Sequence, residues 1–236
     1  MKRGIFVAPF NELSDPGLVA ELAAEAEAAG WDGFFVWDHI VYSEPVRELA
    51  DPWITLAAIA MRTKRITIGP MITPVARRRP HKLARETATL QRLCGGRLVL
   101  GVGLGGNRHG EFDRERFGEE EDRRARARLL DEGLDKLQAY WAGGFQPPAR
   151  VPIWVAGRYP NRRPVRRAAR YDGFFPVDLP GPEALAELVA ELPEGHEVIV
   201  DNDPGADEAA WERAGATWHL TDFGRDPKAA DVRAAL

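Results

Sequence analysis

Short apolar runs alternate with helix-forming segments along the chain, and this alternation restricts the possible folds more than any other feature. The runs are Gly4–Phe10, Gly33–Trp37, Ile66–Ile72, Arg97–Val102, Pro152–Ala156, Gly173–Val177, Glu197–Val200 and Thr217–Leu220. Most of them are nearly continuous in apolar residues, which is typical of parallel strands buried on both faces. Eight strands alternating with helices predict an α/β fold closed into a (β/α)8 TIM barrel. An open doubly wound sheet is the alternative.

The helical segments carry recognisable start and stop signals. Asp15-Pro16 and Asp51-Pro52 each place a capping carboxylate before a proline at the first helical position. The strongest apolar stripe is Leu130, Leu134, Leu137 and Trp141, which ends at Gly143-Gly144. No linker or low-complexity tract interrupts the pattern, so we expect a single compact domain over residues 1–236.

One interval between strands is much longer than the others. It contains the Arg- and Glu-rich stretch Leu104 to Arg128, which we predict to be a loop over the C-terminal mouth of the barrel. Long loops in compact domains are usually functional.

Composition excludes several classes of function. The chain has 36 acidic and 32 basic residues and a formal net charge of −4, so it lacks the basic excess of a nucleic-acid-binding surface. Its uncharged stretches are strand-sized, too short to span a membrane, and the N-terminus is interpreted as a first strand rather than a signal peptide. The single cysteine, Cys94, rules out an intramolecular disulfide framework and predicts a cytoplasmic protein.

Active sites of such barrels are built from the residues that follow each strand. Here these are Phe10-Asn11, Asp38-His39, Thr73-Pro74, Gly103 to Asn107, Gly157-Arg158, Val177-Asp178, Asp201-Asn202 and Thr221-Asp222. His39 is the candidate catalytic residue because imidazole can move a proton near neutral pH. Asp38 is interpreted as its structural partner. The alternative is a histidine that merely bonds a neighbouring loop.

A glycine-rich loop follows the fourth run. Gly101-Val102-Gly103-Leu104-Gly105-Gly106 matches the pattern of a dinucleotide-binding loop. Asn107 to Glu111 lack the features of a helix start, and no strand ending in an acidic residue follows at the required distance. An NAD-dependent Rossmann dehydrogenase is therefore kept only as an alternative.

Two arginine clusters could hold an anion. Gly157-Arg158-Tyr159-Pro160-Asn161-Arg162-Arg163 follows a strand and precedes a helix, where backbone N–H groups and guanidinium groups can bind a phosphate. Arg77-Arg78-Arg79 is expected to lie on the surface, with at most one member reaching the mouth. The five histidines have no metal-ligand spacing, so no metal site is predicted; a metal-dependent barrel hydrolase would need carboxylates and histidines that converge only in the fold.

Taken in order, several motifs resemble the bacterial luciferase-like family of flavin-dependent oxidoreductases. They are Ala29 to His39 (AGWDGFFVWDH), Asp51-Pro52-Trp53, Arg62 to Gly69, Arg79-Pro80, Thr89 to Gly105 (TLQRLCGGRLVLGVGLG), Pro152 to Gly157 and Arg167 to Phe174. Cys94 stands where the family usually has serine. The resemblance covers residues 4 to 177 and implies a (β/α)8 barrel with FMN or the deazaflavin coenzyme F420 at the C-terminal mouth.

The resemblance also implies roles for individual residues. His39 would face the reactive face of the flavin ring, and Asp38 would belong to the same cofactor pocket. Pro70, Met71 and Ile72, where the family often has a non-proline cis peptide, would support the ring. Gly103, Gly105, Gly106 and Asn107 would line it, and Gly157, Arg158 and Asn161 would bind the cofactor phosphate, although Arg-Tyr-Pro-Asn replaces the family's usual Ser/Thr-rich turn.

The predicted function is thus a flavin-dependent oxidoreductase, in the first instance a luciferase-like monooxygenase that acts on a small organic substrate. Reduced FMN would react with oxygen, whereas deazaflavin would exchange a hydride without oxygen, and the choice stays open. A flavin-binding accessory protein without turnover is a further alternative. The family commonly forms homodimers, for which the second and third helices would be the surface.

Overall fold

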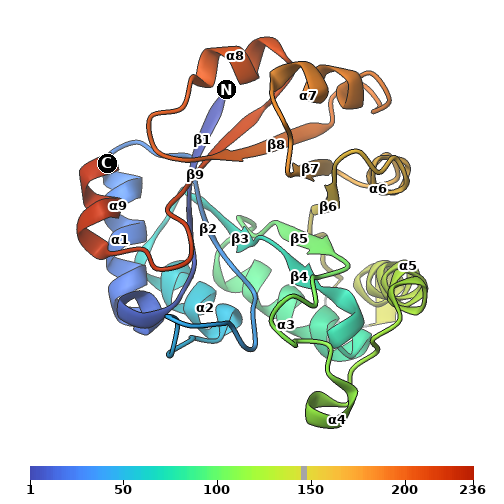
Figure 1. Cartoon of the computed structure of the whole chain (residues 1–236). Helices are drawn as coiled ribbons and strands as arrows, with labels where there is room; N and C mark the ends of the chain where they lie inside the picture. The colour runs from blue at the N-terminus through green and yellow to red at the C-terminus, as the bar shows by residue number, and fades with distance from the viewer. Residues whose placement is uncertain (145–147) are drawn as a thin grey trace.

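Nine parallel strands form one sheet that curls into a nearly closed barrel (Figure 1). The computed structural model describes residues 1–144 and 148–236. Its strands are β1 (Lys2–Val7), β2 (Gly33–Val36), β3 (Thr67–Pro70), β4 (Thr73–Pro74), β5 (Leu100–Gly103), β6 (Ile153–Arg158), β7 (Gly173–Val177), β8 (Glu197–Asn202) and β9 (Trp218–Asp222). The order in the sheet is β3-β2-β1-β9-β8-β7-β6-β5-β4. The barrel prediction is confirmed, and the open-sheet alternative was wrong.

Helices surround the barrel. They are α1 (Pro16–Ala28), α2 (Pro52–Arg62), α3 (Pro80–Leu93), α4 (Arg114–Phe117), α5 (Arg123–Ala139), α6 (Arg163–Ala168), α7 (Pro182–Val189), α8 (Glu208–Arg213) and α9 (Ala229–Ala235), with short helical turns η1 (Asn11–Ser14), η2 (Val75–Arg77) and η3 (Tyr140–Gly144). The carboxylates of Asp15 and Asp51 cap α1 and α2 as predicted, accepting hydrogen bonds from Gly17 N and from Trp53 N and Ile54 N. Proline follows each cap.

The third predicted strand is divided in two, which explains why nine strands are found where eight runs were counted. β3 pairs with β2, whereas β4 pairs with β5, and Met71 and Ile72 lie between them. The peptide bond Met71–Ile72 is cis, as the family resemblance implies. The edges of the sheet meet where Ile68 N donates to Arg97 O and Val99 N donates to Ile68 O.

Two segments differ from their predictions. The predicted loop Leu104 to Arg128 contains α4 and the first turns of α5; Asp122 caps α5 by accepting from Ala125 N. This helix start has no apolar stripe, so periodicity could not locate it. The first strand ends at Val7 rather than Phe10, because Pro9 has no N–H for the ladder. Phe10 instead forms an antiparallel bridge with Leu49.

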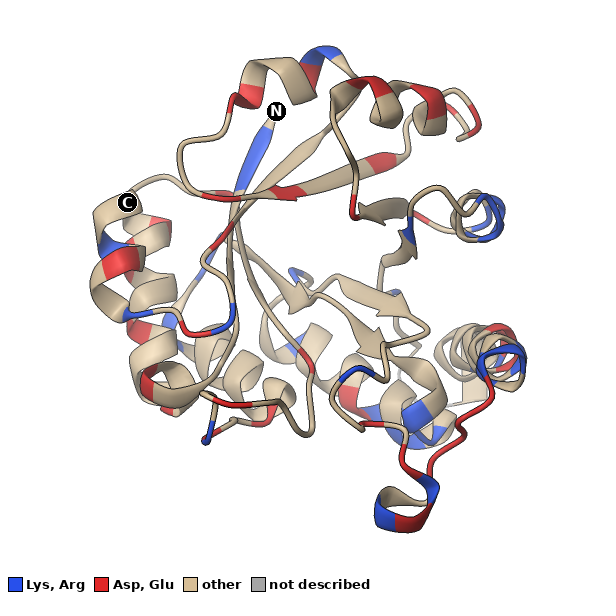
Figure 2. Cartoon of the chain, in the orientation of Figure 1, with Lys and Arg blue, Asp and Glu red and all other residues tan. Residues whose placement is uncertain are grey.

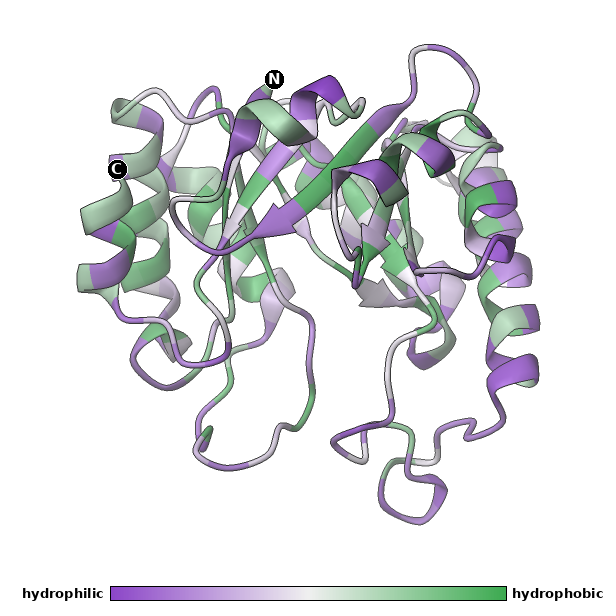
Figure 3. Ribbon diagram, turned by 45° about the horizontal axis from the view of Figure 1, so that its top comes forward, coloured by the Kyte–Doolittle hydropathy of each residue, from purple (hydrophilic) through white to green (hydrophobic). Residues whose placement is uncertain are grey.

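Apolar side chains fill both the interior of the barrel and the layer between strands and helices. The interior contains Phe6, Phe35, Met71, Val99, Trp154, Phe175, Ile199, Trp218 and Leu220. Figure 3 shows hydrophobic strands inside and hydrophilic outer faces on the helices. Among the described residues no helix combines the length and apolar character needed to cross a bilayer.

Candidate active site

A cavity of about 420 Å³ opens at the C-terminal ends of the strands. Its floor is apolar, with Phe6, Ile72 and Phe175 among the lining residues, and its rim carries charged groups from β2, β6, β8 and β9. This is the end of the barrel at which catalytic groups are expected. Three sets of residues give the cavity its chemical character: a buried charge network behind His39, an arginine-bearing wall and an acidic wall.

The Asp38 carboxylate is fully enclosed at the back of the cavity. Its Oδ2 accepts hydrogen bonds from Thr73 Oγ1 at 2.8 Å and from Arg78 Nη2 at 2.8 Å, and Arg77 Nη2 lies 3.2 Å from Oδ1. The side chain of Asp38 is 0% exposed and that of Arg77 is 2% exposed. Asp38 therefore holds the end of β2 against β4 and η2, consistent with the structural role proposed from the sequence.

Arg77 joins Asp38 to a second buried carboxylate, that of Glu111. Arg77 Nη1 donates to Glu111 Oε1 at 2.7 Å, and Ile40 N donates to the same oxygen at 3.2 Å. The expectation was that at most one member of the arginine cluster 77–79 reaches the mouth, but both Arg77 and Arg78 contact the Asp38 carboxylate. Two carboxylates and a backbone carbonyl accept from the terminal nitrogens of the buried Arg77 guanidinium, while its Nε has no partner among the described residues.

His39 lies at the open end of this network. Its Nδ1 is 3.1 Å from Glu111 Oε1, an ion-pair distance without the alignment of a strong hydrogen bond. Burial opposes ionisation of Glu111, but His39 and Arg77 outweigh burial and hold the pKa of this carboxyl below its usual value. Glu111 is therefore a carboxylate at neutral pH, and it can orient the imidazole and stabilise its protonated form.

Glu111 was missed by sequence reasoning. It lies in the predicted mouth loop, where acidic residues are frequent, and only its position between His109-Gly110 and the apolar Phe112 sets it apart. Phe112 is fully buried and anchors the segment, with Arg126 stacked over its ring at 3.9 Å. The anchored aromatic residue is the local signal that could have indicated a buried neighbour.

Aromatic rings surround His39. Phe10, Trp37 and Tyr42 have ring centroids 5.8, 5.7 and 5.1 Å from that of His39, and His109 stacks on Tyr42 at 3.8 Å. Trp37 Nε1 is buried and has no hydrogen-bond partner in the described residues. His109 Nδ1 is likewise buried without a partner among the described residues.

The glycine loop and the broken third strand leave room for a flat group. A Cβ at Gly101 would lie 2.3 Å from Pro70 O, so the two segments touch through backbone. At Gly106, in contrast, a Cβ would meet nothing within 4 Å, and Gly106 lines the cavity. The residues present thus fit a planar cofactor ring, which Met71, Ile72 and the loop Gly103 to Gly106 would hold.

The arginine-bearing wall comes from β6, α5 and α6. Arg158 pairs with Asp178, and Arg167 forms two bonds with Asp131, at 2.5 and 2.9 Å. Arg123, at the start of α5, also lines the cavity and makes no ion pair within the described part of the chain. Figure 2 shows the basic residues gathered on α6. This wall suits a phosphate or another acidic part of a cofactor.

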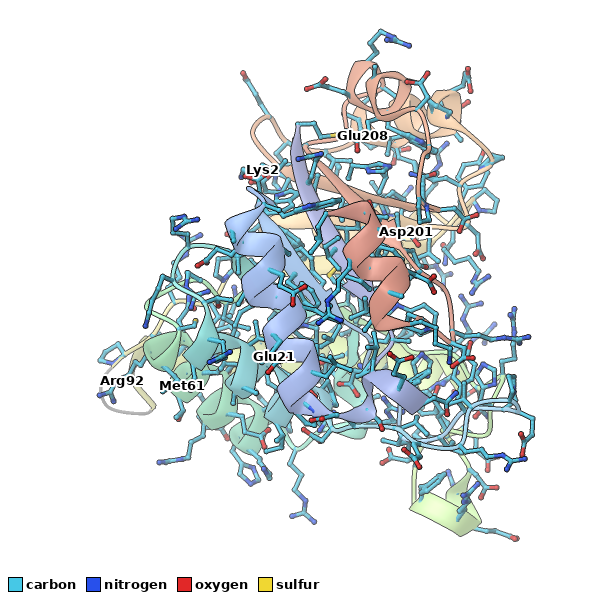
Figure 4. The ribbon with its side chains drawn as sticks, turned by 90° about the vertical axis from the view of Figure 1, so that its left-hand side faces the viewer. Lys2, Glu21, Met61, Arg92, Asp201 and Glu208 are labelled. Atoms are coloured by element: carbon cyan, nitrogen blue, oxygen red, sulfur yellow. The ribbon has the colours of Figure 1, made fainter. Side chains whose placement is uncertain are left out.

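The acidic wall comes from β8 and β9. Asp201 and Asp222 both line the cavity at the ends of these paired strands. Burial, with a smaller contribution from Asp222, raises the pKa of Asp201 to about 7. Burial also raises the pKa of Asp222 to about 6, against a hydrogen bond from Gly224 N. Figure 4 labels Asp201 on the opposite side of the barrel from Met61 and Arg92.

The raised pKa of Asp201 predicts a pH-dependent stability effect. The folded protein holds this proton more tightly than the unfolded chain, so stability is lost as pH rises from about 4 to about 7. At about pH 4, the free energy of unfolding of Asp201→Asn should therefore be close to that of the wild type. At about pH 8, the variant should be about 1–3 kcal/mol more stable than the wild type. Denaturant unfolding at both pH values measures the difference, with Glu194→Gln at an exposed position as the control. A gain of equal size at both pH values would contradict the prediction.

The structure brings most, but not all, of the predicted cofactor residues to the cavity. Those that line it are Asp38, His39, Met71, Ile72, Gly103, Gly105, Gly106, Gly157 and Arg158. Pro70 lies in β3 behind the cavity. Asn107 accepts a hydrogen bond from Phe112 N and fixes the loop, and Asn161 accepts one from Arg163 N at the start of α6. The roles of these residues in cofactor binding stay predictions.

Neither a Rossmann site nor a metal centre is supported by the geometry. The glycine loop after β5 leads into a turn rather than a helix, and the sheet is a barrel. Within residues 1–144 and 148–236, no group of three or more His, Cys, Asp or Glu residues is arranged to hold a metal ion.

Sequence comparisons identify relatives over nearly the whole chain. The model of the luciferase-like monooxygenase family matches residues 1–234. An F420-dependent glucose-6-phosphate dehydrogenase of Beutenbergia cavernae is 33% identical over 196 residues, which cover 72% of this chain and 55% of that protein. A 4-hydroxyprotoasukamycin monooxygenase of Streptomyces nodosus subsp. asukaensis is 33% identical over 107 residues, 43% of this chain and 28% of that protein. The chain spans about half the length, or less, of these curated relatives.

Solved structures of similar fold include two F420-dependent enzymes. An F420-dependent secondary alcohol dehydrogenase in complex with an F420-acetone adduct has a TM-score of 0.77 and 18% identity, covering 100% of this chain and 99% of its own. The coenzyme F420-dependent tetrahydromethanopterin reductase from Methanopyrus kandleri has a TM-score of 0.74 and 16% identity, covering 98% and 95%. The barrel, the cis peptide at the third strand and the family match agree, and the chain belongs to the luciferase-like monooxygenase family.

Proposed function

We propose that this protein is an F420-dependent oxidoreductase that removes a hydride from the carbon of a secondary alcohol, with His39 accepting the hydroxyl proton. His39 carries the proposal, because its imidazole lines the cavity and its Nδ1 lies against the buried Glu111 carboxylate. Because Nδ1 faces Glu111, Nε2 is the ring nitrogen that can accept a proton from substrate.

The residues divide the work as follows. Met71, Ile72 and the loop Gly103 to Gly106 hold the ring, and Gly157, Arg158 and Arg123 hold the acidic part of the cofactor. The deazaflavin, when bound, supplies the carbon that takes the hydride. His39 Nε2 takes the hydroxyl proton, and the oxygen that loses it becomes the carbonyl oxygen of the product. Glu111 stabilises the imidazolium, and the rings of Phe10, Trp37 and Tyr42 exclude water.

The relatives favour deazaflavin over FMN. The curated F420-dependent glucose-6-phosphate dehydrogenases match up to 77% of the chain. The two F420 enzymes of similar fold match this chain almost from end to end. The monooxygenase RslO1 from Streptomyces bottropensis and the long-chain alkane monooxygenase LadA match 91% and 85% of this chain.

Turnover under two conditions tests the proposal. Without oxygen, a panel of secondary alcohols should reduce F420 in the presence of the enzyme, and the absorbance of oxidised F420 should fall. The second candidate is the monooxygenase predicted from the sequence, favoured by the 33% identity with the 4-hydroxyprotoasukamycin monooxygenase. Substrate-dependent oxygen uptake with reduced FMN, and no reduction of F420 by any alcohol, would replace the first proposal by the second. Binding of a cofactor without either reaction would indicate the accessory protein.

We also propose a homodimer through α2 and α3. Ile54 and Met61 are each 64% exposed and Leu93 is 46% exposed. In Figure 4, Met61 and Arg92 lie close together on the side of the molecule formed by these two helices. The cytoplasmic location stays a prediction.

A further inference from the structure

The two acidic groups of the cavity wall differ from the other acidic groups of the site. Asp38 and Glu111 are each paired with arginine. Asp201 and Asp222, in contrast, have no Lys, Arg or His nitrogen of the described residues within 4.0 Å of their carboxylates, and the only side-chain hydrogen bond of Asp222 is to Gly224 N. Where the two carboxyls are ionised, their charge is therefore left for something in the cavity to balance.

The two carboxylates line the same cavity as His39. Tyr42, whose ring centroid is 5.1 Å from that of His39, is acted on by the charges of Arg225 and Arg108 and, more weakly, by that of Asp222. Arg225 is exposed and makes no ion pair with Asp222. Asp201 adds its charge from the neighbouring strand. In Figure 2, acidic residues are seen along β8 and basic residues on α6.

The floor between the two walls consists of aromatic rings without charge. Phe6 lies 5.8 Å from Trp37 and 6.2 Å from Phe175, measured between ring centroids. Ring faces attract cations, and an apolar floor lowers the local dielectric, so the field of Asp201 and Asp222 is weakly screened. An anionic substrate would be repelled here, and a neutral alcohol would gain only hydrogen bonds.

We propose that Asp201 and Asp222 select a substrate that carries a protonated amine on the carbon next to the alcohol carbon. This inference rests on the proposed function, in which the arginine-bearing wall is taken by the cofactor and the acidic wall faces the substrate. Ammonium supplies up to three donors and one positive charge to the two carboxylates, while the hydroxyl reaches His39. This substrate class differs from that of an enzyme that acts on sugar phosphates, because a sugar phosphate is negatively charged.

Three compounds that share the fragment CH3–CH(OH)–CH2 test the assignment. 1-Amino-2-propanol, 2-butanol and 3-hydroxybutyrate carry an ammonium, a methyl and a carboxylate group at corresponding places. Their dissociation constants are measured by calorimetry at about pH 8, where both carboxyls are ionised, with the cofactor-loaded and the cofactor-free protein. We expect 1-amino-2-propanol to bind at least about tenfold more tightly than 2-butanol, and 3-hydroxybutyrate more weakly than either.

Variants assign the effect to the two residues. In the double variant Asp201→Asn with Asp222→Asn, the dissociation constants of 1-amino-2-propanol and 2-butanol should differ by less than about threefold, since only the charge is removed. Glu194→Gln, which removes an exposed carboxylate from the segment before the same strand, should keep the wild-type ratio. Near-UV circular dichroism confirms that each variant is folded.

The outcomes separate this inference from the proposed function. The proposal that the site selects a cationic substrate is overturned, even if F420 binds, by either of two results. One is equal dissociation constants of 1-amino-2-propanol and 2-butanol in the wild type, and the other is a preference for the amine that is unchanged in the double variant. A preference for the amine that persists when no cofactor binds would retain the charge selection and refute the cofactor assignment. Equal loss of selectivity in Glu194→Gln would mean that overall charge, rather than the cavity wall, is responsible, and would also overturn the proposal.

Discussion

The His39→Ala enzyme is expected to reduce F420 about 10²- to 10³-fold more slowly than the wild type, while its dissociation constant for the cofactor changes less than about threefold. Removal of the imidazole takes away the group that accepts the hydroxyl proton, but leaves Met71, Ile72 and the glycine loop in place to hold the ring. The loss should therefore be in kcat. Single-turnover kinetics and a cofactor titration on the same preparation measure both quantities.

Two further substitutions sharpen this test. His109→Ala removes another histidine of the same aromatic wall, one that stacks on Tyr42. This substitution should lower kcat less than about fivefold. Glu111→Gln keeps the shape of the side chain but removes the negative charge behind His39. Its decrease in kcat should therefore lie between those of His109→Ala and His39→Ala. If His39→Ala weakens cofactor binding as much as it lowers kcat, or if His109→Ala is equally damaging, His39 is not the proton acceptor.

Replacing Arg77 by methionine should have the largest effect on stability. Arg77 is the buried cation that holds Asp38 and Glu111 together, and its loss leaves carboxylates without their full compensation in a site with almost no contact with water. Breaking such a buried pair typically costs about 3–5 kcal/mol. Denaturant unfolding at neutral pH measures the change.

The matched control for Arg77→Met is Arg128→Met, which makes the same substitution at an exposed position of α5. It should change the free energy of unfolding by less than about 0.5 kcal/mol. Adding Glu111→Gln to Arg77→Met should recover part of the loss, because the unpaired carboxylate is then neutral. A cost below about 1 kcal/mol for Arg77→Met would show that the network does not support the fold.

The barrel could be predicted because each strand and helix carries a local signal. The apolar runs from Gly33 and Gly173 became β2 and β7, and the caps at Asp15 and Asp51 began α1 and α2. The division of the third strand was not predicted, although Gly69-Pro70 lies within the run Ile66–Ile72. It depends on which neighbour each half pairs with.

The candidate site was predicted only in part, for a related reason. His39 and the glycine loop are recognisable from their place after a strand. The partnership of Arg77 and Glu111 joins residues 34 positions apart, and each looks like an ordinary surface charge in its own segment. Asp201 and Asp222 were among the strand-end candidates, but a wall made from both requires β8 and β9 to be neighbours. Long-range pairing of charges is what the sequence alone does not reveal.

The central claim, that the mouth of this barrel binds a deazaflavin, is tested most directly by paired titrations of the purified protein with F420 and FMN, followed by absorbance. We predict saturable binding of F420 with a dissociation constant in the low micromolar range, at least about tenfold tighter than that of FMN. No affinity for either cofactor at micromolar concentrations would contradict the account, and tighter binding of FMN would contradict its choice of cofactor.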